Sequence, residues 1–243
     1  ETIKCYLAFM NLLSEKIIAF NQNLKLTAAL PENIRFMNPF VENDIALATS
    51  SQFYRKYYAD QRPRQMILGI NPGRHGAGVT GVPFTDTKRL EAICKIPFAG
   101  KSTHEPSSVF VYEVIKAYGG PEAFYQEVYI NSVCPLGFVI QDEKGREKNY
   151  NYYDSKGLTQ AVEPFIIKSI QAQIDFGLKR EVCLCLGSNK NFKYLQALNK
   201  KHHFFEQIIP LEHPRYVIQY KSKHLTTYVE KYLDALQTNR PTL

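Results

Sequence analysis

Four apolar runs that alternate with helical patterns constrain the fold of this chain more than any other feature of its sequence. The runs lie at 65–70, 127–133, 181–187 and 205–211. Apolar residues between and after them recur at helical spacing, in the segments 106–120, 159–178, 188–201 and 221–236. Strands separated by helices pair in parallel and carry the helices on both faces of their sheet. The sequence therefore predicts an α/β fold, a three-layer α/β/α arrangement with a four-stranded parallel sheet.

The length of the chain fits one domain. Its 243 residues, 44% of them hydrophobic, are enough for a single large core. We predict one domain over residues 1–243, in which residues 1–60 form a helical N-terminal extension packed on the rest. An amphipathic pattern predicts the first helix of this extension over 2–21. The segment 141–157 is charged and rich in turn residues, which predicts a surface loop.

The N-terminal pattern and the cysteines indicate the compartment. The helix predicted over 2–21 is interrupted by charge, so it is too polar for a membrane span, and it lacks a signal-peptide cleavage pattern. The five cysteines do not have the paired spacing of a zinc or iron–sulfur site. We expect a cytoplasmic protein with reduced thiols, no membrane association, no metal and no cofactor.

Polar side chains follow the carboxyl ends of the predicted strands. Asn71, Asn131, Ser188 and His213 all fall just after or near these ends. In an open parallel sheet the ligand crevice lies beyond the carboxyl ends of the strands, so we expect these side chains to converge. The formal net charge of +7 favours an anionic partner such as nucleic acid, although many basic proteins bind none.

The stretch ILGINPGRHGAGVTGVPF, residues 67–84, leads the first strand into a loop of bare backbone. Such a loop usually brings a phosphate or a planar ring close to the backbone. It has no lysine for a Walker A loop, and Gly73, Gly76 and Gly78 do not reproduce a dinucleotide-binding fingerprint. An ordinary turn-rich loop is the alternative, but it leaves Asn71 and the closing TGVPF unexplained.

This loop resembles the first motif of the uracil-DNA glycosylase superfamily. GINPG followed by TGVPF is similar to the single-strand-selective monofunctional branch. The similarity continues through EPSSVFVYEVIKAYGGPEAFYQEVYINSVCPLGF and resumes at HPR, where the second motif of the superfamily begins HPS; it covers about residues 65–230. The resemblance implies a monofunctional DNA glycosylase that hydrolyses the N-glycosidic bond of uracil or a 5-substituted uracil in base excision repair. Its partner would be single- or double-stranded DNA, and we expect a monomer.

The chemistry of glycosidic-bond hydrolysis explains the residue types in the first motif. Oxocarbenium character develops on the sugar and negative charge on the departing base, so the enzyme needs a dry slot, donors aimed at the base oxygen and a positioned water. Backbone N–H groups at Gly69, Ile70 and Gly73 can face a base carbonyl, and Phe84 can stack on a flipped ring. Asn71 can orient the water but cannot deprotonate it, which predicts a slower enzyme than one with Asp there.

His213 is the second candidate catalytic residue. It follows the fourth predicted strand and precedes Pro214 and Arg215. A neutral imidazole there could donate a hydrogen bond to the uracil O2 as charge builds on it. The alternative is a structural histidine that caps the loop, but the two other motifs favour catalysis.

Two neighbouring positions compete for the base-reading residue, which in the family is an Asn at the end of the second strand. Alignment on CPL without a gap places Ser132 there, whereas the broader strand-then-Asn pattern of the superfamily places Asn131 there. Neighbouring strand residues face opposite sides, so only one can enter the pocket. We favour Asn131, because a hydroxyl cannot match the paired donor and acceptor of an amide.

The sequence departs from the family after His213, where HPRYVIQYKSKH replaces the family's HPSPxNP run. Arg215 and Tyr216 could still fill the gap left by a flipped base, with Lys221 and Lys223 on phosphates. A solvated basic face is the alternative reading of these four residues. The altered motif also supports a rival function, a DNA-binding protein with weak catalysis. A second rival is a nucleoside or nucleotide hydrolase that uses the same pocket.

Overall fold

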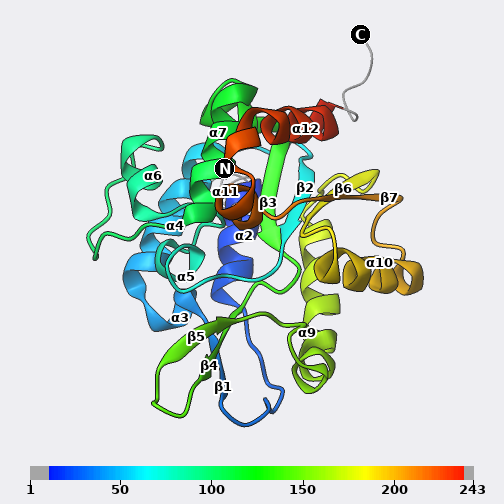
Figure 1. The fold of residues 1–243 in the computed structure, drawn as a ribbon. Coiled ribbons are helices and arrows are strands. Elements are labelled where there is room, and N and C mark those ends of the chain that lie inside the picture. The colour runs from blue at the N-terminus through cyan, green and yellow to red at the C-terminus, as the bar shows by residue number, and fades with distance from the viewer. Residues whose placement is uncertain (1–10, 238–243) are drawn as a thin grey trace, which may run out of the picture.

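A four-stranded parallel sheet forms the centre of the protein. The structure is a computed structural model that describes residues 11–237 (Figure 1). The central strands are β2 (Gln65–Gly69), β3 (Val128–Ser132), β6 (Val182–Leu186) and β7 (Gln207–Leu211), and their order in the sheet is β3-β2-β6-β7. All three pairings are parallel, so the four carboxyl ends lie at one edge. Helices flank the sheet on both sides, which confirms the predicted three-layer α/β/α fold.

Local sequence signals account for the ends of several helices. α7 (Pro106–Tyr118) begins with a proline, whose missing N–H is not needed there, and ends at Gly119 with φ of 118°. Ser155 caps α9 (Lys156–Ile174), and His213 caps α11 (Pro214–Tyr220). The other helices are α2 (Leu13–Gln22), α3 (Pro39–Glu42), α4 (Asp44–Tyr57), α5 (Ala77–Thr80), α6 (Thr87–Ala92), α8 (Pro121–Glu127), α10 (Lys190–His202), the 3-10 turn Ser222–His224 and α12 (Leu225–Gln237).

The N-terminal part of the chain is only partly helical. Of the helix predicted over 2–21, α2 covers the second half, and residues 1–10 lie outside the described part of the chain. α2 packs against α4, and Glu15 of α2 forms an ion pair with Arg55 of α4 at 2.9 Å. Residues 34–37 form a strand instead, so the expected helical extension also contributes to a sheet.

A second, antiparallel sheet is a feature that the sequence did not predict. β4 (Gly137–Gln141) pairs with β1 (Ile34–Met37) on one side and with β5 (Glu147–Tyr150) on the other. The prediction of a surface loop over 141–157 was therefore wrong for β5. The four residues of β5, EKNY, include no fully buried side chain, so the strand has no apolar alternation to signal it. Figure 1 shows this sheet at one end of the molecule, apart from the central strands.

The described residues also show the state of the cysteines. Cys94, Cys134, Cys183 and Cys185 are all buried and unpaired. Burial raises the pKa of the Cys134 thiol to about 12, so this thiol stays protonated and unreactive.

Among residues 11–237 no group of three or more metal-ligating side chains could hold an ion. None of the helices in the same range is long and apolar enough to cross a membrane.

Candidate active site

The loops that follow the central strands bring the first and second motifs together. The loop after β2 carries Asn71, Gly73 and Phe84, and His213 lies just after β7. The centroids of the Phe84 and His213 rings are 5.7 Å apart, and the ring planes are inclined by 53°. The edge formed by the carboxyl ends of the strands is therefore where the two motifs meet.

Phe84 lies directly on the end of β2, and Gly69 makes this possible. A Cβ atom at Gly69 would come within 2.9 Å of two carbons of the Phe84 ring, which is closer than side-chain atoms approach one another. Phe84 itself has a φ of 52°, an unusual left-handed conformation for a bulky residue. The strained backbone and the missing side chain together hold one aromatic ring at the edge of the sheet, where a planar base could stack.

Asn71 is fixed by the chain segment that follows β5. The backbone N–H of Tyr152 donates to Asn71 Oδ1 at 3.1 Å, and Asn71 Nδ2 donates to the carbonyl of Tyr150 at 3.2 Å. Nδ2 also approaches the Pro72 carbonyl at 3.5 Å. Because one main partner donates and the other accepts, only one orientation of the amide satisfies both. Asn71 is therefore a pre-oriented group at the mouth of the loop.

His213 is a neutral imidazole with one committed nitrogen. Its Nδ1 accepts a hydrogen bond from the backbone N–H of Arg215 at 3.2 Å, so the proton of the neutral ring is on Nε2. Burial, together with the Arg215 charge, lowers the pKa of His213 to about 4. At neutral pH the side chain therefore offers a single donor, Nε2–H, next to the Phe84 ring.

The structure places Asn131 and Ser132 on opposite faces of the sheet. Ser132 pairs with Gly69, so its side chain shares the face on which the Phe84 ring lies. Asn131 pairs with Leu68 on the other face, where its Nδ2 donates to the Tyr129 hydroxyl at 2.8 Å and its Oδ1 accepts from the Ser132 N–H at 2.8 Å. Within residues 11–237 the Ser132 hydroxyl has no hydrogen-bond partner.

Comparison with known proteins agrees with this geometry. A family model described as the uracil DNA glycosylase superfamily matches residues 55–237. The chain belongs to this superfamily. It is also similar to a solved crystal structure, wild-type SMUG2 of Pedobacter heparinus, with 50% sequence identity over 93% of this chain and 97% of that one, and a TM-score of 0.92. These matches confirm the resemblance drawn from the motifs and support uracil-DNA glycosylase activity, with DNA as the partner.

One carboxyl group in the glycosylase crevice was missed by the sequence analysis. Glu105 precedes α7, where an acidic residue is ordinary, so nothing in the sequence marks it. It packs on Gly76, where a Cβ atom would lie 1.9 Å from its Oε2, and this oxygen is buried without a hydrogen-bond partner among residues 11–237. Burial raises the pKa of Glu105 to about 7; the Asp86 carboxylate adds to the shift and Arg215 opposes it.

A cavity of about 350 Å³ separates this carboxyl from the antiparallel sheet. Gly73 lines it together with Glu105, Asn149 and Arg215. A Cβ atom at Gly73 would meet nothing closer than Asn149 Nδ2 at 3.6 Å and Glu105 Oε1 at 3.8 Å. Asn149 also accepts the Arg74 N–H at 3.1 Å, so β5 supports this loop as well as Asn71. Because Gly73 has no side chain, the loop after β2 is open toward this cavity.

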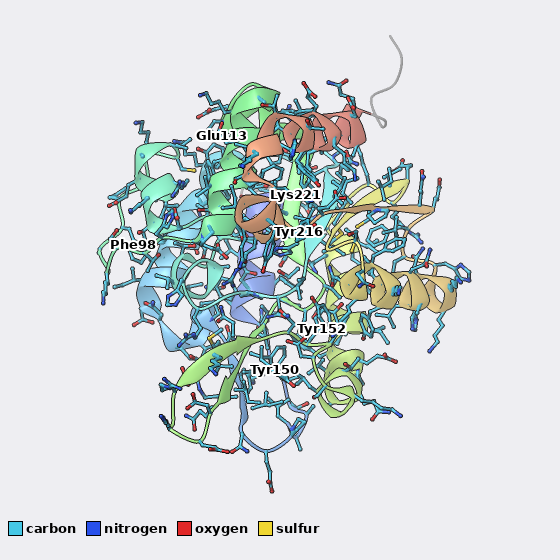
Figure 2. All side chains as sticks on the ribbon, in the orientation of Figure 1. Phe98, Glu113, Tyr150, Tyr152, Tyr216 and Lys221 are labelled. Atoms are coloured by element: carbon cyan, nitrogen blue, oxygen red, sulfur yellow. The ribbon has the colours of Figure 1, made fainter. Side chains whose placement is uncertain are left out.

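The four predicted DNA-binding residues lie together on one surface of the glycosylase. Arg215 and Tyr216 are exposed on α11, and Lys221 and Lys223 follow it, Lys221 half-buried. The Tyr216 ring is 5.4 Å from that of Tyr220, which is 64% exposed, so an aromatic pair faces solvent near His213. Figure 2 shows Tyr216 and Lys221 near the middle of the view, above Tyr152 and Tyr150, which lie nearer the antiparallel sheet.

A cavity of about 500 Å³ joins this surface to the ends of β6 and β7. Tyr216 and His213 line this cavity, and so do Ser188 and Lys190, which lie just before and at the start of α10. Lys190 Nζ lies 5.8 Å from the centroid of the Tyr153 ring. The mouth of the crevice is therefore rimmed by aromatic, hydroxyl and cationic groups, which suit a nucleic-acid backbone.

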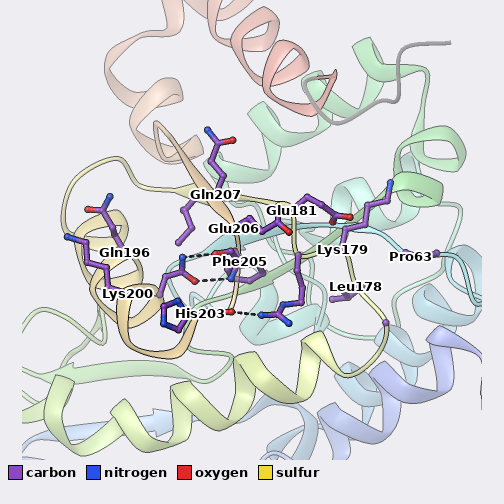
Figure 3. A pocket seen from close by; sticks show the side chains of 14 residues that line it. Pro63, Leu178, Lys179, Glu181, Gln196, Lys200, His203, Phe205, Glu206 and Gln207 are labelled. Carbon is purple, nitrogen blue, oxygen red and sulfur yellow. Dashed lines mark hydrogen bonds between the residues drawn. The ribbon is translucent and has the colours of Figure 1, made fainter.

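Another cavity, of about 1090 Å³, lies away from the crevice, near the amino ends of β6 and β7 (Figure 3). Its charged side chains are of both signs, because Lys179 and Arg180 line it together with Glu181 and Glu206. The Arg180 guanidinium is already engaged, because it donates to the carbonyl of Phe204 at 2.8 Å and to that of His203. None of the motif residues lines this cavity, and we assign it no role in the reaction.

Proposed function

We propose that this protein is a monofunctional DNA glycosylase that releases uracil, or a uracil substituted at C5, from DNA by hydrolysis. One observation carries the proposal: the neutral imidazole of His213 has its Nδ1 occupied and lies beside the Phe84 ring. A base that stacks on Phe84 then has an N–H donor at its edge. Membership of the superfamily supports the general reaction, and the crevice geometry supports the individual roles.

The base slot is formed by one ring and by bare backbone. In the proposed complex the extruded base stacks on Phe84, and stacking with edge hydrogen bonds offsets an unstacking cost of a few kcal/mol. The backbone at Gly69 and Ile70 supplies donors to a base carbonyl. The open side at Gly73 leaves room for a substituent at C5, because the nearest side-chain atoms are 3.6 and 3.8 Å from the missing Cβ.

Asn71 holds the attacking water in this mechanism. Its Oδ1 accepts from Tyr152 N–H through one lone pair and keeps a second lone pair for a water proton. The water then presents its own lone pair to the anomeric carbon of the sugar. An amide cannot take the water proton, which is lost to bulk water or to the departing uracil anion as the C–O bond forms. Asn71 therefore contributes by orientation, which is the larger part of what a positioned nucleophile needs when the sugar already carries positive charge.

His213 stabilises the departing base. Negative charge builds on the uracil oxygen as the glycosidic bond breaks. Because the pKa of His213 is lowered to about 4, the ring is a neutral imidazole at neutral pH, and its Nε2–H donates a hydrogen bond to that oxygen without transferring the proton. The backbone N–H of Arg215 fixes the ring orientation through Nδ1. His213 therefore stabilises the transition state more than it strengthens the binding of substrate.

Ser132, and not Asn131, is our proposed base-reading residue. Ser132 shares its face with Phe84 and has an unpaired hydroxyl, whereas Asn131 lies on the opposite face of the sheet. This revises the preference drawn from the sequence. A rotatable hydroxyl can donate or accept, so it fits more than one base edge. We therefore expect a glycosylase that tolerates several damaged bases.

Arg215, Tyr216, Lys221 and Lys223 form the proposed DNA-binding surface. Exposed cations contact phosphates without sequence preference, and an exposed aromatic ring beside the slot can occupy the space left by the extruded base. Tyr216 lines the same cavity as His213 and is 42% exposed, which supports this role.

Release of free base tests the proposed function. Oligonucleotides that contain uracil, 5-hydroxymethyluracil, hypoxanthine or xanthine would be incubated with the protein, single-stranded and in duplex, and the free base separated by chromatography. We expect base release and a strand that breaks only after alkali treatment, because monofunctional enzymes leave an intact abasic site. Binding without release would favour the weakly catalytic DNA-binding protein. Cleavage of free deoxyuridine at a comparable rate would favour the nucleoside hydrolase.

A further inference from the structure

The segment that orients Asn71 is anchored through the side chain of Tyr152. This side chain is fully buried, and its hydroxyl donates to Asn191 Oδ1 at 2.7 Å. The carbonyl of the same residue accepts from Thr159 Oγ1 at 3.0 Å, which ties the segment to α9. Burial raises the pKa of the Tyr152 phenol far above its ordinary value, so the hydroxyl remains a donor. The backbone N–H that reaches Asn71 is thus held by a residue with two fixed contacts of its own.

Asn191 connects Tyr152 to the ends of two central strands. It lies in the first turn of α10 and is 1% exposed. Because its Oδ1 accepts from the Tyr152 hydroxyl, its Nδ2 faces the carbonyls of Leu186 at 2.9 Å and of Gly69 at 3.3 Å. These carbonyls belong to the last residues of β6 and β2. One buried amide therefore ties the Tyr152 segment to the end of β2, from which the loop with Asn71 begins.

We propose that Tyr152 and Asn191 are positioning residues, which form a buried hydrogen-bond relay that fixes the amide of Asn71 in its water-holding orientation. The relay closes on itself, since Gly69, the last residue of β2, lies two residues before Asn71. Asn191 also lines the cavity of about 500 Å³ beside His213 and Tyr216, whereas Tyr152 does not, so Tyr152 is the member of the relay whose change leaves the lining of that cavity intact. The inference rests on the proposed function, in which Asn71 orients the attacking water.

The relay predicts a loss of rate without a loss of binding. Removal of the phenol hydroxyl leaves Asn191 Oδ1 buried and unpaired, and it frees the segment at 150–152 to shift relative to β2. A small displacement of Asn71 moves the water away from the sugar, and misplacement by about 1 Å can cost as much as 10²-fold in rate. The base slot and the phosphate contacts are unchanged, so affinity for DNA stays the same.

The test is single-turnover base release by Tyr152→Phe, measured with affinity for an abasic-site oligonucleotide and with the melting temperature. We expect release about 10-fold slower than wild type and unchanged affinity. Tyr194→Phe is the matched control, because its ring packs 5.0 Å from that of Tyr152 and its hydroxyl bonds Glu163 at 3.3 Å, away from Asn71. This control should release base at the wild-type rate.

A double-mutant cycle separates positioning from general stability. In an Asn71→Ala background Tyr152→Phe should slow release by less than about 2-fold, because there is no longer an amide to orient. Asn191→Ala breaks the relay from its other end and should show the same non-additivity. A full 10-fold loss in the Asn71→Ala background, or an equal loss in Tyr194→Phe, would overturn the relay.

The relay can also be examined without catalysis. If the wild-type protein releases no base, the proposed function fails, and ¹⁵N NMR of the Asn71 side-chain amide decides about the relay alone. Tyr152→Phe should move the two Asn71 amide proton signals and speed their exchange with solvent, and Tyr194→Phe should not. Unchanged Asn71 signals in Tyr152→Phe would refute the positioning role.

Discussion

At the scale of single residues, His213 combines a structural and a chemical role in one ring. Nδ1 caps α11 by accepting from Arg215 N–H, and Nε2 is left as the donor next to Phe84. Loss of an N-cap alone costs about 0.5–2 kcal/mol of stability, which would lower the melting temperature. Loss of the donor affects the transition state. The structural role is therefore measured by the melting temperature and the chemical role by the rate of base release, both on one protein preparation.

His213→Ala should lower single-turnover base release by about 10²- to 10³-fold, the range for removal of one oxyanion donor. Affinity for an abasic-site oligonucleotide should stay within a few-fold, because the donor acts mainly on developing charge. His224→Ala, which changes an exposed histidine in the turn after α11, is the control. A folded His213→Ala protein with the wild-type rate would remove the catalytic assignment.

Asn71→Ala should reduce single-turnover release by about 10²-fold, as expected when a positioned water is lost. DNA binding should change little, since Asn71 faces backbone groups and not phosphate. The measurement is release under enzyme excess, beside Asn23→Ala, which alters an exposed amide far along the chain. Release at the wild-type rate by Asn71→Ala would show that another group holds the water.

Gly73→Tyr should lose release of 5-hydroxymethyluracil while it retains some release of uracil. The backbone can carry a side chain there, because the nearest atoms to a Cβ are 3.6 Å away, and the ring would then fill the open side of the slot. The ratio of the two single-turnover rates is the measurement. An equal loss on both substrates would indicate a broken loop and would not support the substituent pocket.

At the scale of elements, the site depends on contacts between elements that are far apart in the chain. The hairpin β4–β5 supports the loop after β2 through Asn149 and through the segment after β5. Glu105, the residue just before α7, packs its carboxyl on Gly76 of the same loop. The loop therefore lies between a small antiparallel sheet and the start of a helix. The charge state of Glu105 should affect the stability of this packing.

Glu105→Gln should stabilise the protein at about pH 8 and change it little at about pH 5. The native pKa is raised from 4.5 to about 7, so the folded state binds more protons than the unfolded state in this window, and the wild type loses stability as pH rises through it. Asp86 adds to this effect and Arg215 opposes it.

The measurement is the difference in melting temperature between Glu105→Gln and wild type at both pH values. Glu113→Gln, an exposed carboxyl on the same helix, is the control and should show no such difference. The same melting difference at both pH values would mean that Glu105 does not titrate in this range.

At the scale of the whole molecule, the formal net charge is +7, and the lysines that contribute to it lie both inside and outside the proposed DNA-binding surface. Lys221 and Lys223 lie beside α11 in the proposed DNA-binding surface, whereas Lys200 and Lys201 lie at the far end of α10, next to the cavity away from the crevice. Long-range attraction depends on all four equally at low salt. In the proposed complex, only Lys221 and Lys223 make direct phosphate contacts.

Replacing Lys221 and Lys223 together by Ala should weaken oligonucleotide binding and reduce the slope of log affinity against log salt by about 2, roughly one for each phosphate contact. Replacing Lys200 and Lys201 by Ala removes the same net charge and should leave the slope unchanged. The measurement is a binding titration between about 50 and 200 mM salt. Equal changes in both variants would mean that the protein attracts DNA by net charge alone.

The sequence by itself determined the central strands, the main helices and the two motif loops. β2, β3, β6 and β7 fall within the apolar runs, and α7 runs from Pro106 to the glycine that follows Tyr118. These features depend on residues close together in the chain, such as apolar spacing, caps and turn glycines. The candidates Asn71, Phe84 and His213 were found for the same reason, since each lies in a short local motif.

Only the tertiary structure decided the features that depend on distant partners. β5 exists because β4 pairs with it, and not because EKNY favours a strand. The partners of Asn71 lie 79 and 81 residues away, and the register of β2 against β3 assigns Ser132 to the face of Phe84. The shifted pKa values of Glu105 and His213 come from burial, which arises only when the chain closes over them. Local pattern carries no information about such contacts, because they are set by packing between elements.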